Sequence, residues 1–247
     1  MNMLLVSCVL ASFCATALAN PLSAGQIIAD VDEAMNRADD QTIGWDLVHQ
    51  EPGQKAPRTM AFVAHVRDAL NLTSFTFPAD LKGTRVLTLS RTQMYIYLPA
   101  YEKVRRIASH VTQQGFMGTN YSYEDISMSH LGDIYEGEVL SEDNSSWVLR
   151  LKPKQDTKAP YAKVLVTIDK SLKLPNELQY FNAKDTHLKT ESRLDYECRD
   201  EVCLAQVLRM EDHTRANSWT ELRRSSWAVN PGLDDEVFTV RSLQRGE

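Results

Sequence analysis

Near its start the chain carries apolar residues at the spacing of an α-helix. Ser23 is a residue type favoured at a helix N-cap, and a stripe of apolar side chains follows it at helical intervals. The stripe consists of Ile27, Ile28, Val31, Ala34 and Met35, and the other face carries Asp30, Asp32, Glu33 and Arg37. This spacing predicts an amphipathic helix, and we expect its stripe to pack against the concave side of a curled sheet.

After a loop at Pro52–Pro57, apolar and polar residues alternate with the period of β-strands. The alternating segments lie at 60–67, 84–98, 147–152, 164–168, 188–197, 203–211 and 217–227. Turn residues separate them at regular spacing, which is typical of a large antiparallel sheet that curls on itself. Because the chain has no βαβ rhythm and no internal repeat, the predicted fold class is mostly β (α+β).

Two segments depart from simple alternation. Met94–Leu98 is apolar or aromatic on both faces, so both faces must be covered, either by core or by a core and a bound ligand or helix. Core burial is the commoner of these outcomes.

Gly115–Leu131 interrupts the strand pattern as an irregular segment, in which we expect Ser122 to cap a short helix that has Asp125 in its first turn.

The N-terminal residues have the features of a secretory signal peptide. Met1–Ala19 has no charged residue, is mostly apolar, and ends in the small-x-small pattern of a signal-peptidase site. We expect cleavage after Ala19 and one domain over residues 20–247. A lipid-anchored form through Cys8 is disfavoured, because too few apolar residues precede this cysteine. No later apolar run has the length of a membrane span, so we expect an exported, soluble protein.

Composition and charge narrow the function classes. Of the 247 residues, 43% are hydrophobic and 24% charged, with a net charge of −6. These values are ordinary for a globular protein and exclude a disordered chain, a collagen-like chain and a disulfide-dense miniature scaffold. The mild acidity argues against a nucleic-acid partner, which usually requires a basic face.

Two cysteines follow the predicted signal peptide, Cys198 and Cys203, with Arg199-Asp200 between them as a turn. In an oxidising compartment a close pair favours a disulfide across a hairpin tip. A redox-active pair is an alternative, although the spacing is not C-x-x-C. A zinc site would need two further ligands of suitable spacing nearby.

The sequence carries no recognisable catalytic set. It lacks the nucleophile-elbow, Walker-loop and His-Glu-x-x-His motifs, so we expect no enzyme activity, no cofactor and no metal. His130 with Asp133 and Glu124-Asp125 is the one conceivable metal cluster, but no dedicated ligand spacing supports it.

Arg105 and Arg106 form a small basic cluster that suits an anionic headgroup or an acidic partner. A carboxylate partner in Tyr123-Glu124-Asp125 is their plainer interpretation.

Five blocks of the sequence resemble the bacterial outer-membrane lipoprotein-sorting protein family, the LolA/LolB-like group that includes a treponemal protein domain. The blocks are Phe77–Gly83, Tyr97–Ile107, Phe116–Asp125, Met210–His213 and Asn230–Thr239, and the similarity runs over Ile27–Leu243. The resemblance implies an incomplete antiparallel barrel around an apolar cavity, with the N-terminal helix and short helices covering the concave side.

The same resemblance implies a periplasmic carrier of lipid or lipoprotein acyl chains for envelope transport or outer-membrane sorting. It also implies an inner-membrane transporter as a further partner. We expect the protein to be a monomer that contacts the membrane only peripherally. A non-enzymatic accessory subunit that docks on an export pump or envelope complex without carrying lipid is the alternative function.

We expect six apolar side chains to contact the ligand, and two arginines to contact a partner or headgroup. The ligand-contacting residues are Phe116, Met117, Tyr95, Tyr97, Ile28 and Val31, and the arginines are Arg105 and Arg106. Phe116 and Met117 lie between glycines, as a lid or rim would, although they are equally compatible with plain core residues.

Overall fold

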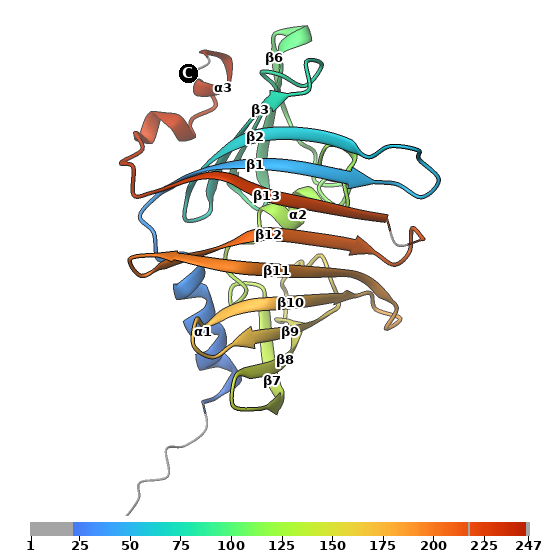
Figure 1. Ribbon diagram of the computed structural model, residues 1–247, viewed down its shortest axis with the longest axis vertical. Helices are drawn as coiled ribbons and strands as arrows, with labels where there is room; N and C mark the ends of the chain where they lie inside the picture. The colour runs from blue at the N-terminus through green and yellow to red at the C-terminus, as the bar shows by residue number, and fades with distance from the viewer. Residues whose placement is uncertain (1–21, 217, 246–247) are drawn as a thin grey trace, which may run out of the picture.

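The computed structural model describes residues 22–216 and 218–245, which form one antiparallel sheet of 13 strands (Figure 1). The strands are β1 (Gln41–Gln50), β2 (Arg58–Arg67), β3 (Leu70–Phe77), β4 (Arg85–Ser90), β5 (Gln93–Leu98), β6 (Lys103–Arg106), β7 (Tyr135–Glu142), β8 (Ser146–Pro153), β9 (Lys163–Asp169), β10 (Leu174–Phe181), β11 (His187–Arg199), β12 (Val202–Asp212) and β13 (Ser218–Val229). The predicted signal peptide, with Cys8 and Cys14, lies outside the described residues.

The sheet consists of two meanders joined edge to edge. Strands β1 to β6 pair in sequence order, strands β7 to β13 do the same, and β1 pairs with β13 to unite them. Strands β6 and β7 are the two edges of the sheet, so it curls without closing. The predicted large antiparallel sheet and incomplete barrel are therefore confirmed.

The predicted N-terminal helix is confirmed as α1 (Ala24–Met35). Ser23 and Gln26 form a capping box, and the apolar stripe is buried, with Ile28 4% exposed and Val31 0%. The helix packs on β7, β10 and β12, on the concave side of the sheet (Figure 1). A Cβ at Gly137 of β7 would lie only 3.0 Å from Cδ1 of Ile28, so the glycine permits this close approach.

The connection between β6 and β7, residues 107–134, crosses the concave side, and we refer to it as the insert. It contains η2 (Phe116–Gly118) and α2 (Tyr123–Ile126). As expected, Ser122 is the N-cap of α2 and Asp125 lies in its first turn, and the two residues form a capping box. Phe116 joins a row of rings, 5.7 Å from Phe75 and 5.3 Å from Tyr123 between centroids. The insert is therefore part of the core as well as a cover over it.

The C-terminal segment covers the outer face of β3 to β5. Its elements η3 (Asp235–Phe238) and α3 (Ser242–Arg245) bury Phe238 and Leu243 in a second, small apolar cluster, against which Tyr95 and Tyr97 pack. Met94 and Ile96 of the same strand belong to the main core on the inner face. Both faces of β5 are thus covered by protein, the inner face by the main core and the outer face by the short helices η3 and α3, without a ligand being needed to cover either. A further short helix, η1 (Pro99–Tyr101), links β5 to β6.

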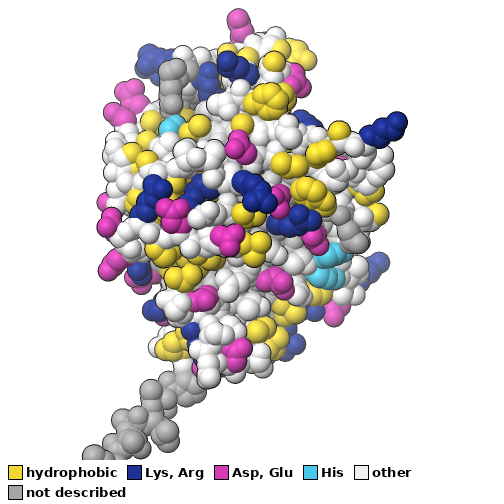
Figure 2. Space-filling model, in the orientation of Figure 1, with side chains coloured by type: hydrophobic (Ala, Val, Ile, Leu, Met, Phe, Trp, Pro, Cys, Tyr) yellow, Lys and Arg dark blue, Asp and Glu magenta, His cyan; other side chains and the backbone are white. Residues whose placement is uncertain are grey.

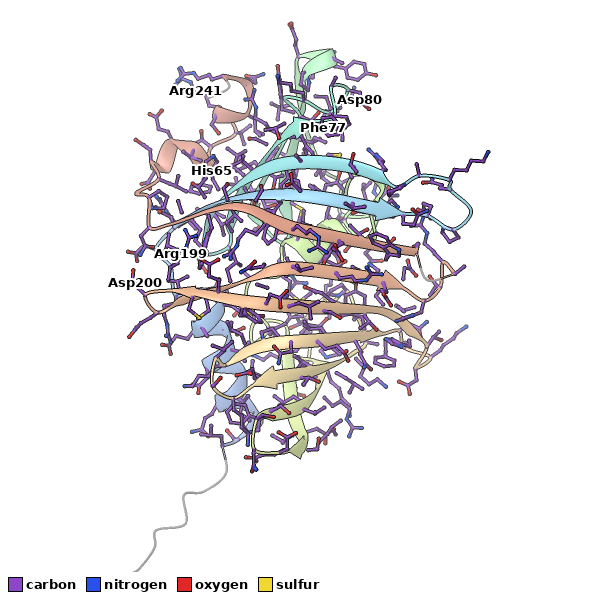
Figure 3. The ribbon with its side chains drawn as sticks, viewed as in Figure 1. His65, Phe77, Asp80, Arg199, Asp200 and Arg241 are labelled. Carbon is purple, nitrogen blue, oxygen red and sulfur yellow. A yellow bond between two sulfur atoms is a disulfide. The ribbon has the colours of Figure 1, made fainter. Side chains whose placement is uncertain are left out.

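The β11–β12 hairpin ends in the expected disulfide. Cys198 and Cys203 are directly opposite each other in the strand register and are bonded. Asp200 has a φ of +53° in the turn between them, and Figure 3 shows Arg199 and Asp200 at this tip.

The outer face of the second meander is mixed polar. In Figure 2, basic and acidic side chains lie next to one another over the middle of this face. Arg209 of β12, for example, contacts Glu211 at 3.0 Å and Glu221 at 3.3 Å. Among residues 22–216 and 218–245, no helix is both long enough and apolar enough to cross a membrane.

Candidate ligand cavity

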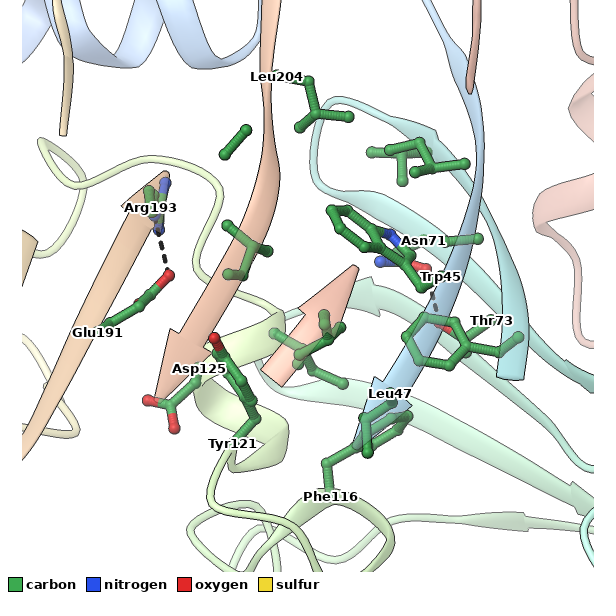
Figure 4. A pocket seen from close by; sticks show the side chains of 18 of the residues that line it. Trp45, Leu47, Asn71, Thr73, Phe116, Tyr121, Asp125, Glu191, Arg193 and Leu204 are labelled. Carbon is green, nitrogen blue, oxygen red and sulfur yellow. Dashed lines mark hydrogen bonds and ion pairs between the residues drawn. The ribbon is translucent and has the colours of Figure 1, made fainter. Parts of the chain in front are cut away.

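A cavity of about 250 Å³ lies on the concave side of the sheet, between the two meanders and the insert (Figure 4). Side chains from both meanders, α1 and the insert line it. They are Met35, Ile43, Trp45, Leu47, Phe62, Ala64, Val66, Asn71, Thr73, Phe116, Thr119, Tyr121, Asp125, Ile126, Leu174, Glu191, Arg193, Tyr196, Cys203, Leu204, Ala205, Leu208 and Leu222.

Strand alternation builds the apolar wall of the cavity. Every second residue of β1 and of β2 points inward, and the strand register places Ala64 beside Ile43 and Phe62 beside Trp45. Small Ala64 therefore lies among larger neighbours, where its side chain leaves space. The sequence predicted the alternation of β2, but it did not identify β1 as a strand.

Buried hydrogen bonds attach the insert to the ends of β11 and β13. Asn120 Nδ2 donates to the carbonyl of Ser218 at 2.7 Å, and its backbone N–H donates to Thr220 Oγ1 at 3.0 Å. Lys189 Nζ donates to the carbonyl of Asn120 at 2.8 Å. Asn120, Ser218 and Thr220 are all buried, so these bonds hold the insert in place over the cavity.

One end of the cavity is polar, and we define it by Tyr121, Asp125, Glu191 and Arg193. Arg193 Nε donates to Glu191 Oε1 at 2.9 Å, and Lys189 Nζ lies 3.1 Å from Asp125 Oδ2. The hydroxyl of Tyr180 donates to Glu191 Oε2, and that of Tyr161 donates to Asp125 Oδ1, both at 2.6 Å. Each carboxylate is thus neutralised by one cation, and each of its oxygens accepts at least one hydrogen bond.

For the residues of the polar end, the alternation of the sequence did not show whether their side chains face the core or the solvent. Glu191 and Arg193 alternate with apolar and small residues in β11, and a charged face usually meets solvent. The structure turns this face inward, with Glu191 only 5% exposed. Asp195, with a φ of +55°, interrupts the alternation, so that Tyr196 also lines the cavity.

The hydroxyl of Tyr121 differs from its neighbours in having no partner. The residue is 7% exposed, and Oη has no hydrogen-bond partner among residues 22–216 and 218–245. Burial raises the pKa of this phenol well above its usual range, and Glu191 raises it further, so the hydroxyl stays protonated.

The size of the cavity limits what fits without rearrangement. At about 30 Å³ for each heavy atom, roughly the volume per molecule in liquid water, the space holds about eight carbons. A medium-length hydrocarbon segment therefore fits as the cavity stands, whereas a longer chain would protrude or widen it.

Of the six residues expected to contact a ligand, the structure places Phe116 at the cavity. Met117 has a φ of +50° and packs on the core, but its side chain is not among those lining the cavity, and its carbonyl accepts from Arg58 at 2.8 Å. Ile28 and Val31 lie on the buried face of α1 but do not line the cavity. The residue of α1 that lines it is Met35.

Tyr95 and Tyr97 lie on the outer face of β5 under the C-terminal segment, with the guanidinium of Arg85 5.2 Å from the Tyr97 ring. Their strand brings them to the second cluster rather than to the cavity, because the period of a strand sends Met94 and Ile96 to the opposite face.

Arg105 and Arg106 are exposed in the edge strand β6, where Arg105 lies 6.0 Å from the ring of Tyr101 and Arg106 donates to the carbonyl of Thr92. The expectation of a carboxylate partner in residues 123–125 is wrong, because those carboxylates are already engaged. Asp125 pairs with Lys189, and Glu124 accepts from Thr112 at 2.7 Å.

His130 contacts Asp68 instead of joining a cluster with Asp133 and residues 124–125. Among the residues that the structure describes, no group of three or more His, Cys, Asp or Glu side chains could hold a metal ion.

Comparisons with known proteins agree on the fold. A family model described only as that of an uncharacterized protein matches residues 67–245. None of the curated proteins compared matches the sequence. Among solved structures, a candidate outer membrane lipoprotein-sorting protein domain from Vibrio parahaemolyticus has a TM-score of 0.79 at 24% identity, covering 88% of this chain and 97% of the other.

Two further solved structures are similar over comparable lengths. A DUF1329 family protein from Desulfovibrio piger has a TM-score of 0.83 at 24% identity, covering 90% of this chain and 98% of its own. A LolA superfamily protein from Nitrosomonas europaea has a TM-score of 0.73 at 20% identity, with coverages of 89% and 98%. At these identities the likeness establishes a shared fold.

Proposed function

The chain belongs to the family of uncharacterized proteins whose model matches residues 67–245, and it has the fold of the LolA-like lipoprotein-sorting domains; from this premise we propose that it is a non-enzymatic carrier that holds lipid or lipoprotein acyl chains in its concave cavity. The observation that carries the proposal is the cavity itself. It lies on the inner side of the curled sheet, and apolar side chains from both meanders form most of its wall.

The physical basis of carriage is the burial of hydrocarbon. Each methylene that leaves water contributes about 0.8 kcal/mol, so about eight of them contribute about 6 kcal/mol before the costs of immobilisation. The net binding free energy is smaller than this gain, and a modest net value supports reversible holding, which a carrier needs at both its loading and its release step. Longer chains would gain more only where the cavity widens.

The insert is the part whose movement would widen the cavity. It contributes Phe116 and Tyr121 to the lining, and the polar contacts of Asn120 fasten it to β11 and β13. Each hydrogen bond between the insert and the strand ends contributes about 0.5 to 1.5 kcal/mol when water can replace the partner, and a ligand that covers the exposed apolar side chains would offset the opening. We therefore place loading and release at the insert, with the curled sheet as the fixed wall.

Export supports the same assignment. The disulfide of Cys198 and Cys203 suits an oxidising compartment such as the periplasm. A signal peptide at Met1–Ala19, one domain over residues 20–247, a monomeric state and a membrane transporter as partner complete the proposal, and each stays a prediction.

A chain-length series tests the proposal directly. Unlabelled methyl esters of six to fourteen carbons would displace a fluorescent acyl probe from the purified protein. Affinity should rise about fourfold for each added methylene and then flatten near the length that fills the cavity. Displacement independent of chain length, or no probe binding at all, would contradict the carrier role. A protein that binds no acyl chain but co-purifies with a membrane complex would instead fit the accessory-subunit alternative.

A further inference from the structure

The polar end of the cavity contains a hydrogen-bond donor that the protein itself leaves unused. Tyr121 is 93% buried, since 7% of its surface is exposed, and its hydroxyl has no partner among residues 22–216 and 218–245. An unpaired buried polar group is unfavourable, and native proteins contain few of them. Figure 4 shows Tyr121 rising from the insert into the cavity, between Asp125 and the apolar side chains.

The acceptors near this hydroxyl are already engaged. Glu191 accepts from Arg193 through Oε1 and from Tyr180 through Oε2. Asp125 accepts from Tyr161 through Oδ1, and its Oδ2 accepts from Lys189 and from the backbone N–H of Ser122. The hydroxyl of Tyr121 donates to neither carboxylate, so a ligand that satisfies it must bring its own acceptor.

The charge balance of the polar end limits the ligand further. Arg193 neutralises Glu191, and Lys189 neutralises Asp125, so the four charges cancel in pairs. An anionic headgroup would enter a buried site without a free counter-charge, next to two carboxylates. Burial of an unpaired charge is far more costly than burial of a neutral hydrogen-bonded group.

We propose that the polar end of the cavity binds the neutral carbonyl oxygen of an ester- or amide-linked acyl chain, which accepts a hydrogen bond from Tyr121 Oη while the hydrocarbon lies along β1 and β2. A carbonyl brings an acceptor and no charge, whereas a free fatty acid brings either a negative charge or an additional donor. The inference rests on the proposed function, and it narrows the cargo to esterified or amidated chains rather than free fatty acids.

The test compares three ligands that share an eight-carbon chain on the wild type and on Tyr121→Phe. Calorimetry at pH 8 measures methyl octanoate and sodium octanoate, and headspace partition measures n-octane, which has no polar atom. Wild type should bind methyl octanoate at least tenfold more tightly than octanoate. Tyr121→Phe should weaken methyl octanoate binding about threefold to tenfold, the worth of one neutral hydrogen bond, and should leave n-octane binding unchanged.

A matched control variant is Tyr95→Phe, which removes a phenol hydroxyl on the outer face of β5 and should leave all three ligands unaffected. Tyr121→Phe should fold and melt at least as high as the wild type, because its hydroxyl makes no protein hydrogen bond. Octanoate binding equal to or tighter than methyl octanoate, or unchanged methyl octanoate binding in Tyr121→Phe, would overturn the inference while n-octane binding kept the carrier proposal intact. If wild type bound neither n-octane nor the ester, both the inference and the proposed function would fail.

Discussion

Filling the cavity from within should raise the stability of the protein and lower its affinity for cargo. Ala64 is 4% exposed and lines the cavity from β2, so Ala64→Leu would extend three carbons into the empty space. At about 30 Å³ each, these carbons occupy about 90 Å³. That is more than a third of the cavity, whose volume is about 250 Å³.

The same three carbons set the size of both effects. Their removal from water contributes at most about 2 kcal/mol to the free energy of unfolding, which corresponds to a rise in Tm of about 4 to 8 °C for a chain of this length. The ligand loses room for about three methylenes, also about 2 kcal/mol, so its Kd should increase roughly 30-fold.

Ala61→Leu is the matched control, because it makes the same change in the same strand on the opposite face. Ala61 is paired with Phe77, which is 51% exposed, so the added carbons meet the surface and not the cavity. We expect its Tm and its Kd to stay close to those of the wild type.

Thermal unfolding by circular dichroism and titration with a fluorescent acyl probe measure the two quantities on the same samples. A lower Tm for Ala64→Leu would mean that the space is too small or the wall too rigid to accept three carbons. A higher Tm with unchanged probe affinity would show that acyl chains bind elsewhere, and the reasoning from the cavity would then be refuted.

Three further predictions concern the fold around the cavity. Ile28→Asp places a carboxylate in a site that is 4% exposed and should lower the free energy of unfolding by about 3 kcal/mol in urea titrations; an unchanged midpoint would mean that α1 does not need its apolar stripe. Replacing Cys198 and Cys203 by serine opens a short loop, with a sequence separation of 5, and should lower the free energy of unfolding by at most about 2 kcal/mol in urea titrations; a midpoint equal to that of the wild type would mean that the disulfide adds no stability. Burial lowers the pKa of His130, but the hydrogen bond with Asp68 and the charges of Asp68, Asp32 and Asp133 together outweigh burial and raise the pKa above 6.5. These interactions therefore stabilise the fold below about pH 6.5, and their contribution is lost as the pH rises through the folded-state pKa. His130→Gln should accordingly remove the decline in Tm that the wild type shows as the pH rises above 6.5, and an identical pH profile in the variant would contradict this assignment.

The elements that local pattern determines were predictable from the sequence. The cap at Ser23 and the apolar stripe that follows it specify α1, because both act within a few residues of each other. The Ser122 cap did the same for α2 inside an otherwise irregular connection. The disulfide followed from the spacing of the two cysteines across a turn.

The cavity residues were largely beyond sequence reasoning, because long-range contacts decide which face of a strand is inside. Period-2 alternation in β11 is the same whether Glu191 faces solvent or core, and only the pairing with Arg193 and Tyr180 makes its burial favourable. Tyr95 failed as a cavity candidate for a similar reason. The C-terminal segment that covers Tyr95 is more than a hundred residues away in the chain, and no local sequence pattern predicts that contact.

The most direct test of the account is the lipid content of the protein when it is purified from cells. Wild type, Ala64→Leu and Ala61→Leu, each produced with Met1–Ala19 and purified without detergent, would be extracted with organic solvent and their acyl lipids quantified by mass spectrometry. We predict close to one ester- or amide-linked acyl species for each wild-type and Ala61→Leu molecule, and several-fold less for Ala64→Leu. Lipid absent from all three proteins, or present in equal amounts in Ala64→Leu and Ala61→Leu, would contradict the claim that the concave cavity carries acyl chains.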